Sequence, residues 1–111
     1  MTHFTPEKIN IDDATTARGG LMRKLAAGDN VAMRIWCNER PEDKEPYPHA
    51  HDYETVGYVI EGRARLHIED ESILLEPGDS WLVPSQAEHY YEILEEFTAI
   101  EATSPSWEES A

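Results

Sequence analysis

Short apolar segments separated by turn-forming residues run along most of this 111-residue chain and constrain its fold more than any other feature. None of them keeps the 3.6-residue periodicity of an amphipathic helix over several turns. Glycine, proline, asparagine and aspartate interrupt the chain at intervals of roughly 5–12 residues, for example at 27–30 and 76–79. This pattern predicts an all-β barrel or sandwich of about eight to ten short strands, with helix as a minor component.

The length suits one domain with one hydrophobic core. We expect an N-terminal arm at 1–20, a β-barrel at 21–103 and a C-terminal tail at 104–111. The expected strands are 21–25, 31–38, 49–60, 63–69, 72–75, 80–83, 89–94 and 97–103.

Acidic residues outnumber basic ones by 23 to 9, which gives a formal net charge of −14. Nucleic acids and anionic membranes are bound mainly through Lys and Arg, so neither is an expected partner. A single cysteine, Cys37, excludes an intrachain disulfide and is interpreted as a small buried apolar residue. No apolar run reaches the length of a signal peptide or a membrane span, and a cytoplasmic location is expected.

Three histidines suggest a metal site. His49 and His51 are two residues apart, so in a β-strand both would point to the same face with Cα atoms about 6.6–6.8 Å apart. Two imidazoles at this spacing can lean onto one ion, and His89 would supply a third neutral donor. His3 and His67 are interpreted as ordinary arm and surface residues.

The segments around these histidines resemble the two motifs of the cupin superfamily, in its small single-domain (cupin 2) form. The first motif is His-x-His, a glutamate, and a closing glycine; the second is Gly, five residues, Pro-x-Gly, two residues, His. The matching residues are His49, His51, Gly62, Gly78, Pro84 and His89, and Gln86 replaces the second glycine of the later motif. The resemblance covers about 45–103 and implies a jelly-roll β-barrel, also called a double-stranded β-helix.

The sequence departs from the motif at the carboxylate ligand. Thr55 occupies that position, and Glu54 beside it would face the other way in a regular strand. Either a bulge turns Glu54 inward or the site has three histidines and no carboxylate, and strand alternation favours the second. Tyr53 and Tyr91 share the parity of the histidines, so they either line a pocket or fill the barrel.

The strand expected at 31–38 has two faces, and the sequence alone leaves the inward one open. Met33, Ile35 and Cys37 form the more natural core face. Arg34 would anchor a carboxylate only if its own face pointed inward. Trp36 and Trp81 are interpreted as core or interface aromatics.

The resemblance implies one divalent transition-metal ion (Fe, Zn, Ni, Mn or Cu) held by His49, His51 and His89. We expect a metal-dependent enzyme acting on a small molecule, dioxygenase-like or isomerase-like, because such ions are Lewis acids with open coordination positions. The alternatives are a non-catalytic binding or sensor domain and an empty structural barrel. A homodimer, formed through barrel edges and arms, is the expected assembly.

Overall fold

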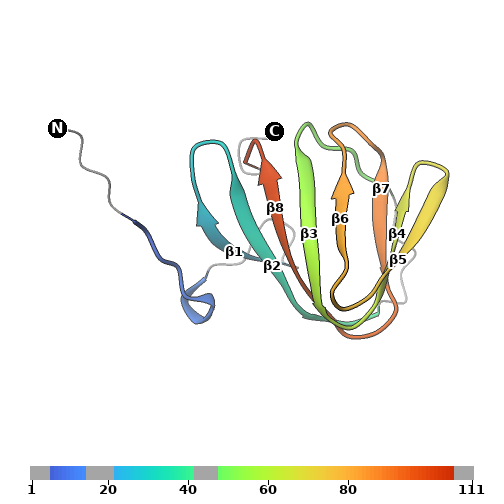
Figure 1. The fold of residues 1–111 in the computed structure, drawn as a ribbon, viewed down its shortest axis with the longest axis horizontal. Coiled ribbons are helices and arrows are strands. Elements are labelled where there is room, and N and C mark those ends of the chain that lie inside the picture. Colours follow the sequence, from blue (N-terminus) through green and yellow to red (C-terminus); the bar gives the residue numbers. More distant parts are fainter. Residues whose placement is uncertain (1–5, 15–21, 42–47, 107–111) are drawn as a thin grey trace.

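The computed structural model describes residues 6–14, 22–41 and 48–106, and its described part is all β apart from one 3₁₀ turn, η1 (Ile11–Asp13). Eight strands form two antiparallel sheets (Figure 1). They are β1 (Met22–Ala27), β2 (Ala32–Glu39), β3 (Glu54–Glu61), β4 (Ala64–Ile68), β5 (Glu71–Leu75), β6 (Ser80–Val83), β7 (His89–Ile93) and β8 (Phe97–Ser104). The predicted all-β jelly roll is confirmed.

Strand order explains how distant parts of the chain meet. The larger sheet runs β1-β2-β8-β3-β6 and the smaller one β5-β4-β7. The last strand, β8, therefore lies between β2 and β3, and both of its neighbours pair with it along most of its length. Side chains from the beginning, middle and end of the chain thus share one barrel interior.

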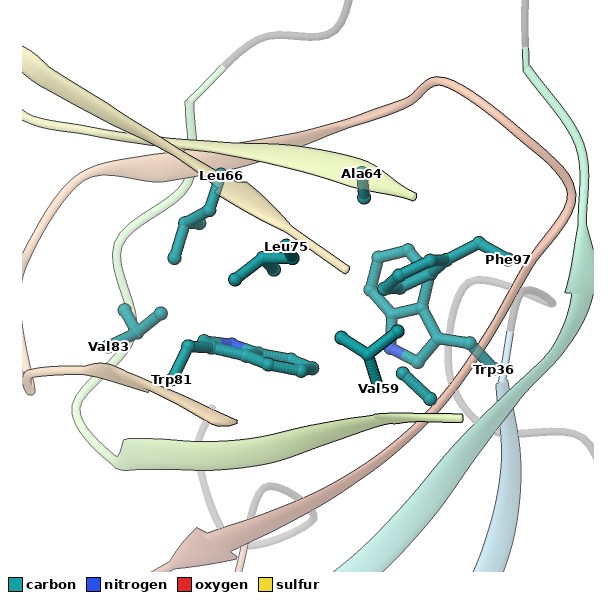
Figure 2. Close-up of a cluster of buried hydrophobic side chains, with 9 residues drawn as sticks. Trp36, Val59, Ala64, Leu66, Leu75, Trp81, Val83 and Phe97 are labelled. Atoms are coloured by element: carbon teal, nitrogen blue, oxygen red, sulfur yellow. The ribbon is translucent and has the colours of Figure 1, made fainter. Parts of the chain in front are cut away.

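The core lies between the two sheets, where each strand presents alternate side chains (Figure 2). Its members come from both sheets and are Trp36, Val59, Ala64, Leu66, Leu75, Trp81, Val83, Phe97 and Ala99. Trp36 meets Phe97 edge-on, with ring centres 5.7 Å apart. Burying large side chains of this kind stabilises a fold by about 1.5–3 kcal/mol each. The interpretation of Trp36 and Trp81 as core aromatics is confirmed.

The prediction for β2 is correct for Ile35, which is 7% exposed, but wrong about which face points into the barrel. Arg34 and Trp36 lie on the inner face, whereas Met33 is 37% exposed on the outer one and Ile35 is not part of the main core cluster. The cause is the register with β8, which places Arg34 opposite Glu101 and Trp36 opposite Ala99. Because Glu101 and Ala99 face inward on β8, their cross-strand partners do so as well.

The predicted continuous strand at 49–60 is also wrong at its beginning. β3 starts at Glu54, a bend occupies 52–53, and His49 makes only an isolated bridge. The histidine pair therefore lies on a connecting segment in front of the strand. Regular alternation from His49 to Thr55 does not apply.

The predicted arm and tail lie partly outside the described residues, so the domain boundaries stay a prediction. Within the described part, β8 ends at Ser104 and Ser106 is buried. No helix there is long and apolar enough to be a candidate membrane span.

Candidate functional site

Backbone hydrogen bonds bring the two histidine segments together. The amide of His49 donates to the carbonyl of His89, and the amide of His89 donates back, both at 2.9 Å. The amide of Gln86 donates to the carbonyl of His51 at 2.7 Å. Residues almost forty positions apart are therefore held side by side by main-chain contacts.

Left-handed backbone occurs at Gly62, directly after β3, and at Gln86, in the segment before His89. Gly62 has φ of +81°, and a Cβ there would overlap the backbone of Glu96, so only glycine fits. Gln86, which replaces a motif glycine, has φ of +71°. The left-handed conformation associated with that glycine is thus present although the residue is different.

The three imidazoles gather around one end of the barrel. The ring centres of His51 and His89 are 5.6 Å apart, and those of His49 and His51 are 6.2 Å apart. Ligands at about 2.0–2.1 Å from one zinc ion would have ring centres roughly 5 Å apart. The rings are slightly too far apart, and no group of three potential ligands within the described segments is close enough to hold a metal ion.

The chemistry of two of these histidines nevertheless suits metal binding. His89 is 8% exposed, and its Nδ1 lies 3.0 Å from the carbonyl oxygen of Ala87. A neutral His89 donating from Nδ1 to that oxygen keeps the Nε2 lone pair available, an arrangement typical of metal ligands. Burial lowers the pKa of His51 below its ordinary 6.5, and His89 and Arg34 act in the same direction. His51 is therefore kept in the neutral form that binds metal.

Among the other predicted residues, Tyr53 and Thr55 point inward and are 5% and 3% exposed, whereas Glu54 is exposed. Tyr53 stacks on His51 with ring centres 4.7 Å apart and planes 6° from parallel. The Thr55 hydroxyl makes no hydrogen bond within the part of the chain that the structure describes. The structure brings Tyr53 and Thr55 inside and leaves Glu54 outside.

A buried ion pair lies next to these residues, and the sequence analysis missed its acidic member. Arg34 Nε donates to Glu101 Oε2 at 2.9 Å, and the two side chains are 12% and 1% exposed. Trp36 Nε1 donates to Glu101 Oε1 at 3.1 Å. Although burial alone would lower it, the pKa of Arg34 is raised by the Glu101 carboxylate. Alternation along β8 could have revealed Glu101, because it shares its face with Phe97 and Ala99.

Tyr91 links this ion pair to His89. Its ring meets His89 edge-on at 5.8 Å, and its hydroxyl accepts a hydrogen bond from Trp81 Nε1 at 3.0 Å. The Tyr91 ring also meets Trp36 edge-on, with ring centres 4.9 Å apart, and Trp36 donates to Glu101. Burial and the Glu101 charge raise the pKa of Tyr91 well above 10, so the phenol stays protonated.

A comparison with known protein families identifies the family to which this chain belongs. A family profile described as "Cupin domain" matches residues 36–100, which is more than half of the chain. The chain belongs to the cupin domain family. A comparison with curated proteins gives no match.

Solved structures agree with this cupin in fold. An RmlC-like cupin from Shewanella frigidimarina NCIMB 400 aligns with a TM-score of 0.78 and 22% identity, over 95% of this chain and 96% of the other. KdgF from a Halomonas species aligns with a TM-score of 0.74 and 23% identity, over 92% and 96%. BH2720 from Bacillus halodurans gives 0.71 and 18%, over 91% and 82%. At these identities the likeness concerns the fold alone.

Proposed function

We propose that this cupin binds one divalent transition-metal ion through His49, His51 and His89 and acts on a small molecule at that site. The observation that carries the proposal is the reciprocal backbone pairing of His49 with His89, with the His51 ring 5.6 Å from that of His89. Binding requires the rings to approach by about 1 Å from their present separations. His49 is exposed, so most of this approach falls to its side chain, whereas the His51 ring is held against Tyr53.

The donor set determines the chemistry. Three neutral imidazoles leave the full charge of the ion uncompensated, so a bound ion would act as a Lewis acid or lower the pKa of bound water. Either role is compatible with a dioxygenase-like or an isomerase-like enzyme. The protein's own contribution is an enclosed polar setting, in which the Thr55 hydroxyl makes no hydrogen bond to the described residues and can donate to or accept from a ligand.

Metal analysis of purified protein tests the proposal. We expect about one ion per chain in the wild type and a loss of most of it in His49→Ala, His51→Ala and His89→Ala. His67→Ala is the matched control, since His67 pairs with Glu92 at an exposed site. Equal, low metal in all five proteins would end the proposal.

A non-catalytic binding or sensor domain is the second candidate. The distances between the histidine rings favour this candidate, because they are longer than one shared metal ion allows. Turnover separates the two: oxygen consumption or product formation with thiols, diketones and small acids supports an enzyme. A ligand bound inside a metal-free barrel, with no turnover, supports the binding domain.

We also propose a homodimer, formed through the outer face of the five-stranded sheet. Five large apolar residues are 37–53% exposed there: Met33, Val56, Tyr58, Ile60 and Leu82. Val56 lies directly opposite Leu82 across β3 and β6, so the apolar surface continues from strand to strand.

Sedimentation of Leu82→Glu tests this face. We expect the variant to shift toward monomer, whereas Ile73→Glu, equally apolar and exposed but on β5 of the other sheet, should not. A monomeric wild type would contradict the assembly.

A further inference from the structure

Two of the three histidines are each backed by a tyrosine. Tyr53 stacks under His51 at 4.7 Å, and Tyr91 meets His89 edge-on at 5.8 Å. A ring packed in this way limits the rotation of the imidazole beside it. The orientation of both imidazoles therefore depends on what holds the tyrosines.

Each tyrosine leads to one member of the buried ion pair. The Arg34 guanidinium lies over the Tyr53 ring, 5.8 Å from its centre, in a cation–π contact. Tyr91 meets the indole of Trp36 edge-on, with ring centres 4.9 Å apart, and that indole donates to Glu101. Arg34 and Glu101 then close the chain of contacts with their own bond of 2.9 Å.

Glu101 is the residue on which these contacts converge. Its carboxylate receives donors from Arg34 and Trp36 on β2, and Trp36 packs against Tyr91 on β7, the strand that carries His89. A buried ion pair is a weak source of stability, because desolvation offsets much of the attraction. A role in orienting the site explains its position better than stability does.

We propose that Glu101 is a positioning residue of the histidine site, acting on His89 through Trp36 and Tyr91 and on His51 through Arg34 and Tyr53. The inference rests on the proposed metal-binding function. β8 carries none of the three histidines, yet its residue Glu101 would set the orientation of two of them, His51 and His89, toward the ion. A carboxylate is required because an amide would turn its NH₂ group toward one of the donors now bonded to Glu101.

Co²⁺ binding, followed by titration and by the visible absorption spectrum of the loaded protein, tests the proposal. We expect Glu101→Gln to bind Co²⁺ about tenfold more weakly and with a changed spectrum, at the lower end of what outer-shell substitutions cost. Tyr91→Phe, which removes one hydroxyl, should change both in the same direction but less. A merely structural role would lower the melting temperature and leave the spectrum of the bound ion unchanged.

Matched controls come from the outward side of β7. Tyr90 stacks on His67 and Glu92 pairs with it, so Tyr90→Phe and Glu92→Gln repeat the two chemical changes away from the site and should leave Co²⁺ binding unaltered. If Glu101→Gln does not fold, Tyr91→Phe decides. Folded variants with wild-type affinity and spectrum would overturn the inference alone, whereas a wild type that binds no Co²⁺ overturns the proposed function and this inference together.

Discussion

The two ends of the barrel interior differ in chemistry although the same strands build both. At one end Val59, Phe97 and Ala99 are fully buried. Two residues further along β8 the inner face changes to Glu101, and then to Thr103. On β3 it changes to Thr55, and on β2 it changes from Trp36 to Arg34.

Strand register arranges this change in layers. Trp36, Ala99 and Val59 lie opposite one another, then Arg34, Glu101 and Gly57, then Ala32, Thr103 and Thr55. The first layer is apolar, while charged or hydroxyl side chains enter in the second and third. Sites that depart from apolar core packing are commonly functional. We infer that the apolar end supplies stability and the polar end supplies function.

Among the substitutions that test whether the two ends are separable, Phe97→Ala should have the largest effect on stability. Removing a fully buried aromatic ring should destabilise the fold by about 3–5 kcal/mol. Chemical denaturation measures the loss, and Co²⁺ titration of the folded variant should give wild-type affinity. Weakened Co²⁺ binding would show that the two ends are not separable.

Replacing both members of the Arg34–Glu101 pair should weaken Co²⁺ binding and cost little stability, which is the reverse of the result expected for Phe97→Ala. Glu101→Leu alone removes the carboxylate that pairs with the buried charge of Arg34 and should cost about 3–5 kcal/mol, whereas Arg34→Met with Glu101→Leu should recover most of that loss. Equilibrium unfolding of the single and double variants gives the difference. We expect the double variant to remain folded and to bind Co²⁺ more weakly. Wild-type affinity would show that the buried ion pair does not influence the histidine site.

Gly57→Ala probes the border between the ends. A Cβ at Gly57 would overlap the indole of Trp81, whose Nε1 donates to Tyr91. Overpacking of this kind costs about 1–3 kcal/mol, so a lower melting temperature is expected. Because Trp81 must move, tryptophan fluorescence should change too. An unchanged melting temperature and emission would mean that the indole has more room than the structure indicates.

The smallest expected effect is on the pH dependence of stability, to which His51 contributes. The pKa of His51 is lowered in the folded protein by burial, by His89 and by Arg34, so the unfolded chain takes up this proton more readily. The contribution of His51 to stability is therefore present above about pH 6.5 and is lost as the pH falls through the lowered value. Thermal unfolding of metal-free wild type and His51→Gln between pH 7.5 and 5 should show a shallower decline in the variant. Parallel curves would contradict the assignment.

Much of the fold could be predicted from local patterns. Turn chemistry located β4, β6 and β8 within a few residues, and the motif spacing identified Gly62 and the histidine segments. The beginning of β3 could not be found in this way. A bend at 52–53 interrupts the pattern, and the segment before it is ordered by hydrogen bonds to residues near His89.

Local patterns in the sequence are enough to predict the strands and turns and to identify the three histidines, because alternation and turn preference act over a few neighbouring residues. Which side chains face the barrel interior depends on long-range strand pairing. Alternation gives β2 two faces, but only its register against β8 turns Arg34 inward, directly across from Glu101. Alternation along β8 places Glu101 on the inner face, but neither segment alone shows that Glu101 pairs with Arg34, 67 positions away, because that contact forms only when the sheets assemble.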